Sequence, residues 1–170
     1  MKMTRLDRIE KGIEALQLSQ LKTDAQLAKT ERILSSIGIN MGYAAEEFFA
    51  HSLQEKKMLG KIRFDAVALQ LKGHKGKVQD EFDIVLYNGE SVGIVEVKYK
   101  VHPADVEKLV SRKLPNFKAL FPKYADSVFY LGIAGMSIPK EAAELAEGSG
   151  IAVLRQKGDL LVMNNNLKGY

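Results

Sequence analysis

The sequence contains no cysteine and only three histidines among its 170 residues. Without cysteine the chain can form neither disulfides nor thiolate metal sites, so carboxylate oxygens and imidazole nitrogens are the remaining strong metal ligands. We expect His51 to be a structural or surface residue. His102 precedes Pro103 near the end of the strand that contains Glu96 and Lys98 and could reach a site there, but no second histidine stands at ligand spacing. Any metal site is therefore expected to consist of carboxylates.

Long apolar runs are also missing, so the sequence shows neither a membrane-spanning segment nor a signal peptide. There are no internal repeats or low-complexity tracts. The formal net charge is only +4, and such a charge favours a polyanionic partner only where the basic residues cluster. These features predict a cytoplasmic protein with one globular domain.

Residues 1–38 have a helical pattern with a narrow apolar stripe. The stripe follows alternating steps of three and four residues, and its apolar members are Leu6, Ile9, Ile13, Leu16, Leu27, Leu34 and Ile37. Gln20, Thr23 and Thr30 fill the remaining positions, and a polar layer can define helix register. The spacing predicts a homodimeric coiled coil, because so narrow a stripe cannot stabilise a lone helix in water. The alternative is an amphipathic helix packed on its own domain.

Residues 39–170 are predicted to form an α/β domain in which helices and strands alternate. Pro103 lies near the start of the second helix, and Pro115 is expected to kink or divide it near Leu114. The expected elements, in order, are helix 40–58, strand 61–71, loop 72–77, a hairpin over 81–98, helix 103–120, strand 127–134, helix 139–147 and strands 151–154 and 160–163.

The hairpin contains the most informative residues of the chain. Asn88-Gly89 between two β-rich runs is a strong hairpin signal. A two-residue loop places Asp83 opposite Ile94 and diagonal to Glu96, whereas a four-residue loop places Asp83 directly opposite Glu96. In either register Asp83, Glu96 and Lys98 share one face, because side chains alternate along a strand. A three-residue loop without a bulge would separate them.

Charged side chains within an apolar strand need a compensating partner, because burial removes their hydration. A hard divalent cation such as Mg²⁺ favours carboxylate oxygens and would relieve the repulsion between Asp83 and Glu96. Lys98 could then orient an attacking water or stabilise charge on a phosphoryl group. The simpler alternative is an ordinary solvated edge strand, on which alternating charged residues face water.

Asp83 and the Glu96-Val97-Lys98 tripeptide resemble the motif of the PD-(D/E)XK nuclease-like superfamily. The resemblance covers about residues 40–156 and implies a restriction-endonuclease-like core, in which a helix, a three-stranded antiparallel meander, a second helix and a further strand form a mixed sheet flanked by helices. Phe82 occupies the position where the family label has proline. The family commonly adds a glutamate from the first core helix, which implies Glu46, with Glu47 as the alternative. Without that role, either glutamate would belong to a solvated helix face.

The resemblance implies a metal-dependent nuclease that uses Mg²⁺ or Mn²⁺, with DNA a more expected substrate than RNA. In this interpretation Asp83 and Glu96 bind the metal, Glu46 assists through a water, and Lys98 positions the nucleophile. The alternative is a nuclease-like fold that serves as a dimeric binding or scaffold module with an idle site.

Two groups of basic residues are candidates for contacts with nucleic acid. One lies on the expected loop and includes Lys75 and Lys77, together with Lys72 and His74. The other lies on or near the helix expected over 103–120, and its members are Lys108, Arg112, Lys113 and Lys118. Lys100 points to the same face as Glu96 and Lys98 by strand period, and it could contact a phosphate or merely mark the end of the strand. Ordinary solvated surface is the alternative for both groups, because lysine is common on loops and exposed helix faces.

Overall fold

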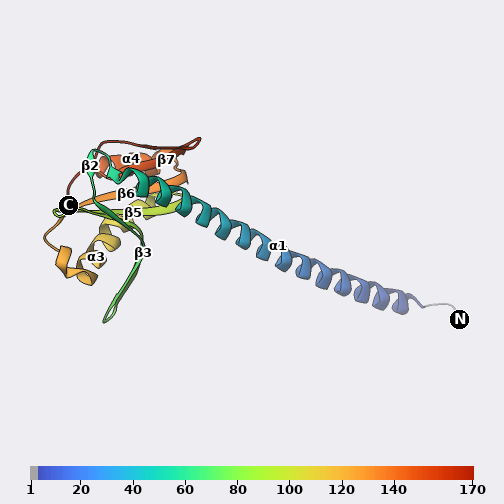
Figure 1. The fold of residues 1–170 in the computed structure, drawn as a ribbon. Coiled ribbons are helices and arrows are strands. Elements are labelled where there is room, and N and C mark those ends of the chain that lie inside the picture. Colours follow the sequence, from blue (N-terminus) through green and yellow to red (C-terminus); the bar gives the residue numbers. More distant parts are fainter. Residues whose placement is uncertain (1–3) are drawn as a thin grey trace. The chain divides into compact units, whose positions relative to one another are not determined.

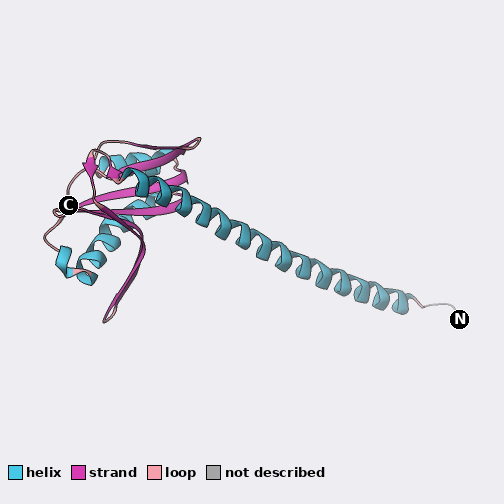
Figure 2. Ribbon diagram, in the orientation of Figure 1, coloured by secondary structure: helices cyan, strands magenta, loops and turns pink. Residues whose placement is uncertain are grey.

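The computed structural model describes residues 4–170, which form one long helix followed by an α/β domain (Figures 1 and 2). The chain divides into two compact units, Met1–Met41 and Gly42–Tyr170. Among residues 4–170, no helix has both the length and the apolar character that crossing a membrane requires.

The helix α1 (Arg5–Lys56) is continuous over 52 residues. Its start is a capping box, in which the Asp7 amide donates to Thr4 Oγ1 and the Thr4 amide donates to Asp7 Oδ2. The predicted helix of residues 1–38, called the arm from here on, and the predicted helix 40–58 are thus parts of one helix from Arg5 to Lys56, and Gly38 does not interrupt it. The apolar members of the predicted stripe are exposed to solvent along the arm.

The α/β domain contains a mixed sheet of six strands in the order β3-β4-β5-β6-β7-β8. The first three strands form an antiparallel meander, β6 and β7 run parallel to β5, and β8 is antiparallel to β7. The strand bounds are β3 (Ala66–Lys75), β4 (Val78–Tyr87), β5 (Ser91–Lys100), β6 (Val128–Ser137), β7 (Ala152–Lys157) and β8 (Leu160–Met163). The predicted α/β class and the strands near the C-terminus are confirmed.

The connection from β5 to β6 is divided, as Pro115 predicts. It consists of α2 (Pro103–Lys108), the π-helical turn η1 (Leu109–Lys113), α3 (Leu114–Leu120) and the 3₁₀ turn η2 (Pro122–Tyr124). Proline has no amide hydrogen to donate to the preceding helical turn, so regular α-helical bonding cannot continue through this point. The short helix α4 (Lys140–Gly148) then connects β6 to β7.

Apolar clusters cover both faces of the sheet. One contains Val92 and Ile94 of β5 with residues of α2, α3 and α4 such as Phe117. The other contains Val95 and Val97 with residues from the end of α1 such as Phe49. Strand β5 is therefore a central strand buried on both faces, and the solvated edge considered as an alternative is wrong.

Two predicted loops differ in the structure. The expected loop 72–77 is mostly strand, because β3 extends to Lys75 and turns through Gly76, whose φ of +61° suits glycine. The loop after β4 has four residues, since Tyr87 pairs with Val92. The two-residue loop is thus wrong and the four-residue alternative is right.

The side chain of Asn88 explains the longer loop. Its Oδ1 accepts the amides of Glu90 and Ser91, and its Nδ2 donates to the Arg63 carbonyl. These bonds form an Asx-type turn and tie it to a neighbouring segment.

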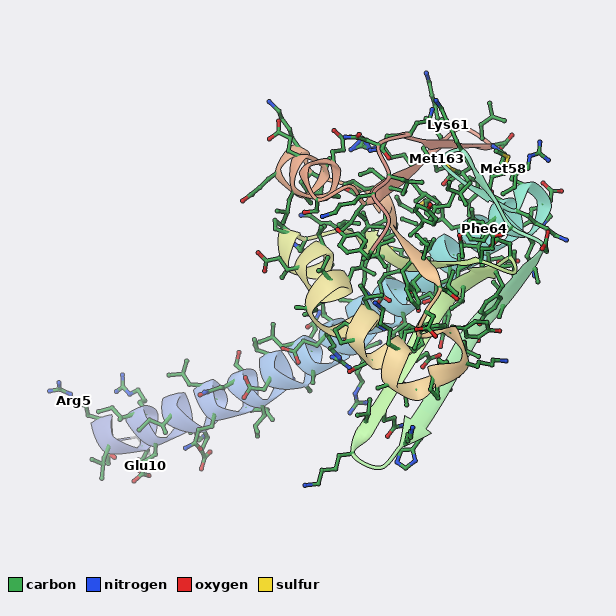
Figure 3. All side chains as sticks on the ribbon, turned by 90° about the vertical axis from the view of Figure 1, so that its left-hand side faces the viewer. Arg5, Glu10, Met58, Lys61, Phe64 and Met163 are labelled. Atoms are coloured by element: carbon green, nitrogen blue, oxygen red, sulfur yellow. The ribbon has the colours of Figure 1, made fainter. Side chains whose placement is uncertain are left out.

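A small two-stranded sheet, absent from the sequence-based expectations, connects α1 to the main sheet. It pairs β1 (Met58–Leu59) with β2 (Ile62–Arg63). The Gly60 amide between these strands lies 3.0 Å from Met163 Sδ, and Met58, Phe64 and Met163 lie at the same end of the domain (Figure 3). The expected strand 61–71 is therefore two strands, β2 and β3.

Candidate active site

The β4–β5 register brings Asp83 opposite Glu96. The paired residues run from Tyr87 with Val92 to Ile84 with Val95, and Asp83 and Glu96 are the next residues of the two strands. At this point Asp83 Oδ2 accepts the Val97 amide at 2.7 Å. The Asp83 side chain thus accepts a backbone amide of β5 at the point where the β4–β5 ladder ends. This hydrogen bond holds the Asp83 carboxylate against β5.

The meander is locally distorted around Asp83. Gln70 in β3 has a φ of +48°, and the ladder to β4 skips Gln70 and Asp83. Phe82 and Val85 belong to the same core cluster, although strict alternation would place them on opposite faces. Strand β4 therefore turns about its axis at Asp83. Local backbone irregularity of this kind is common next to functional sites.

Glu96 and Lys98 lie on the same face of β5, as predicted. Lys98 Nζ donates to Glu96 Oε1 at 2.8 Å. Only 8% of Glu96 is exposed, although it carries a charge in a central strand. Its location is therefore unusual for a carboxylate and requires cationic partners.

Lys113 supplies the second cationic partner of Glu96. Its Nζ lies 3.2 Å from Glu96 Oε2 and 3.2 Å from Asp80 Oδ1, and it also donates to the Glu81 carbonyl. Glu96 Oε2 has no hydrogen-bond partner, so it faces Lys113 as an ion pair only. We expected Lys113 at most as a surface contact to nucleic acid, yet its side chain is only 14% exposed.

Asp80 is the residue of the candidate site that sequence reasoning missed. Its side chain is 3% exposed and contacts Arg112, Lys113 and Asn116. Within the sequence, Asp80 precedes Glu81 in a polar stretch, and nothing local distinguishes it from a solvated residue. Its partners lie more than thirty positions away, so only the packing of η1 and α3 on the sheet identifies it.

Glu46 lies near Asp83, as the family resemblance implies. Glu46 Oε2 accepts from Gln70 Nε2 at 3.4 Å, and Glu46, Tyr43, Gln70 and Asp83 line a common pocket. Glu47 is more exposed than Glu46. The geometry therefore favours Glu46 over Glu47 as the helix carboxylate of the site.

The surroundings change the proton affinities of three site residues. Burial and the negative charge of Glu96 raise the pKa of Asp83 to about 6, against the opposing effects of the Val97 amide and Lys98. Burial disfavours the charge of Lys98, but the hydrogen bond and charge of Glu96 raise its pKa above the ordinary value. Although burial acts in the opposite direction, hydrogen bonds from Asn116 and Lys113 hold the pKa of Asp80 low. Asp80 and Asp83, whose pKa values shift in opposite directions, thus lie on the same strand, β4.

The two predicted metal ligands are compatible with Mg²⁺. Among residues 4–170, no three acidic or histidine side chains gather as a preformed metal cage. Mg²⁺ commonly uses only one or two carboxylates and completes its shell with waters and substrate phosphates. Glu96 Oε2 accepts no hydrogen bond and Asp83 has an elevated pKa, so both carboxylates would gain from a divalent cation.

The basic residues and histidines that the sequence also suggested do not gather in one place. Lys75, Lys77 and Lys100 are exposed, and Lys72 pairs with Glu81 at the surface. Lys118 lies over the Phe129 ring, away from the pocket that Lys108, Arg112 and Lys113 line. His51 is exposed beside Glu55, as expected of a surface residue, whereas the His102 backbone caps α2.

Comparison of the chain with protein-family models, with curated proteins and with solved structures finds no match. The functional interpretation therefore depends on the residues and geometry of the site itself.

Proposed function

We propose that the protein is a metal-dependent nuclease with a restriction-endonuclease-like core. The observation that carries the proposal is the group formed by Asp83, Glu96 and Lys98, in which two carboxylates and an ammonium converge at the end of the β4–β5 ladder. A helix, a three-stranded meander, a crossover helix and a parallel strand surround this group in the order that the family resemblance implies.

The reaction would hydrolyse a phosphodiester, forming one P–O bond to water and breaking one P–O bond to the leaving nucleotide. When bound, Mg²⁺ or Mn²⁺ supplies a water of lowered pKa and offsets negative charge on the phosphate. Asp83 and Glu96 would hold the metal. Lys98 would orient the attacking water, and Glu46 would assist through a water.

The test is incubation of the purified protein with duplex DNA, single-stranded DNA and RNA in Mg²⁺ or Mn²⁺. We expect cleavage, with DNA preferred. The cleavage rate should fall at least about 100-fold in Glu96→Gln, which removes a metal ligand, and in Lys98→Met, which removes the group that orients the attacking water. Lys157→Met is the control, because Lys157 is an exposed lysine at the end of β7 and lies outside the candidate site.

If wild type and Glu96→Gln gave equal background cleavage, the nuclease proposal would be wrong. One observation favours a second candidate, a nuclease-like binding module with an idle site, because both Glu96 oxygens already face ammonium groups. In that case the protein would bind DNA without cleaving it, and Glu96→Gln would leave the affinity unchanged.

The partners that we propose are nucleic acid and a second copy of the chain. The support for a homodimer is the exposed heptad stripe on a continuous helix, since such a stripe buries its apolar area by pairing with a copy of itself. A dimer would present two sites to one polymer.

A further inference from the structure

A basic pocket of about 190 Å³ opens beside Glu96. Its lining combines four cationic and two acidic side chains from β5, α2 and η1, namely Lys98, Lys108, Arg112, Lys113, Glu96 and Asp105. The volume is far above the requirement of a single water. The pocket therefore has room for a polyatomic anion and an excess of positive charge to attract it.

Buried Asp80 holds two of these cations in place. Asp80 Oδ2 lies 3.4 Å from Arg112 Nε, and Asp80 Oδ1 lies 3.2 Å from Lys113 Nζ. Asn116 and the Glu81 amide donate to the same carboxylate. Since Arg112 binds Asp80 through Nε, its two terminal nitrogens remain available for an anion in the planar geometry that suits phosphate.

The acidic side chains of the pocket are already engaged. Asp105 accepts the His102 amide at the start of α2, and Glu96 pairs with Lys98 and Lys113. Lys108 makes no ion pair within residues 4–170, so its charge is free to act on a ligand. The arrangement is thus suited to an incoming anion, because its own carboxylates cannot satisfy all four cations.

We propose that this pocket binds a phosphate group of a polynucleotide, next to the phosphodiester that the proposed reaction would place at Glu96. The inference rests on the proposed function for the class of ligand, and it deepens that function by assigning a second phosphate site. It holds equally for a protein that cleaves and for one that only binds. The phosphate can be an internal phosphodiester or a terminal phosphate, which share the chemistry that the pocket recognises.

The test is fluorescence anisotropy with a short single-stranded DNA labelled at its 3′ end, carrying either a 5′-phosphate or a 5′-hydroxyl. Ca²⁺ replaces Mg²⁺, and electrophoresis confirms that the DNA stays intact. We expect Lys108→Met and Arg112→Met each to weaken binding several-fold. Each should also reduce the slope of log K against log salt by about 0.7, the amount expected for one lost phosphate contact on a single strand.

Lys140→Met is the matched control, because Lys140 is exposed on α4 and lies outside the pocket. It should leave affinity and slope unchanged. Equal binding by all three variants, or no DNA binding by wild type, would overturn the proposal. Thermal melting of each variant separates a lost contact from a lost fold.

The two DNA forms identify the source of the phosphate. Tighter binding of the 5′-phosphorylated form by wild type, lost in Lys108→Met and Arg112→Met, would assign a terminal phosphate. Equal affinities for both forms, both weakened in these variants, would assign an internal phosphodiester. DNA binding that needs the pocket without cleavage in Mg²⁺ would refute the nuclease proposal and leave this inference intact.

Discussion

Glu96 has an ammonium group against each of its carboxylate oxygens, Lys98 on one and Lys113 on the other. This pairing makes a buried charge tolerable within a central strand. It would not prevent the proposed metal binding, since a carboxylate offers about four lone-pair sites, Lys98 uses one of them, and Oε2 accepts no hydrogen bond. The same residue can therefore be neutralised in the free protein and act as a ligand in the loaded protein.

Asp83 lacks such direct compensation, and this leads to a prediction about pH. Its pKa in the folded protein is about 6, above the ordinary value of 3.8. Between these values the folded state binds more protons than the unfolded state, so stability should fall as the pH rises from about 4 to 6 and stay lower above that. At pH 7 in EDTA, we expect Asp83→Asn to be more stable than wild type by on the order of 1–3 kcal/mol.

Urea denaturation at about pH 4 and pH 7 tests this prediction. The advantage of Asp83→Asn should shrink to a small fraction at the lower pH, where the carboxyl is protonated in the folded state and about half protonated in the unfolded state. Asp159→Asn, in an exposed turn, is the control and should show no such pH dependence. A constant advantage at both pH values would contradict the explanation.

At the scale of single elements, β3 and β4 are irregular where the site is built. Gln70 is one of only two residues other than glycine with a positive φ within residues 4–170. A left-handed conformation costs an ordinary residue about 1–2 kcal/mol. The distortion coincides with the turn of β4 that directs Asp83, so the strain accompanies the placement of a site residue.

This strain predicts opposite effects for two glycine substitutions in neighbouring strands. Gln70→Gly should leave stability unchanged or raise it by up to about 1 kcal/mol, because glycine adopts a positive φ without strain. Gln79→Gly, in the regular part of β4, should lower it by roughly 0.5–1 kcal/mol. Chemical denaturation gives both values. Equal destabilisation by the two changes would show that Gln70 is not strained.

At the scale of the whole molecule, the arm is the feature without an assigned partner. Its stripe includes Ile13 at 50% and Leu16 at 72% exposure, whereas Leu18 and Leu21 lie on another side of the same helix at 56% and 67%. These pairs match in chemistry and exposure and differ in heptad position, so they form a controlled comparison.

The dimer proposal predicts that Ile13→Lys/Leu16→Lys sediments as a monomer while wild type sediments as a dimer. Leu18→Lys/Leu21→Lys should remain dimeric, because those positions lie outside the apolar stripe. Sedimentation equilibrium of the full chain measures the masses. A monomeric wild type, or equal masses for the two double variants, would rule out dimer formation through the stripe.

Local sequence signals predicted most of the fold. Alternating apolar residues located the strands, Pro115 located the break before α3, and turn residues located the hairpin. Two of the boundaries that were wrong depended on interactions outside the local apolar pattern. Asn88 lengthened one loop through its own hydrogen bonds, and pairing with β4 extended β3 into the expected loop.

The sequence by itself determined that Glu96 and Lys98 share a face, because strand periodicity is a local property of the chain. Only the tertiary structure decided that Asp80 and Lys113 join them and that β5 lies at the centre of the sheet. Those contacts connect residues far apart in sequence and form when the crossover η1–α3 packs on the meander. Such packing depends on the shape and charge of both surfaces together, and no short stretch of sequence contains that information.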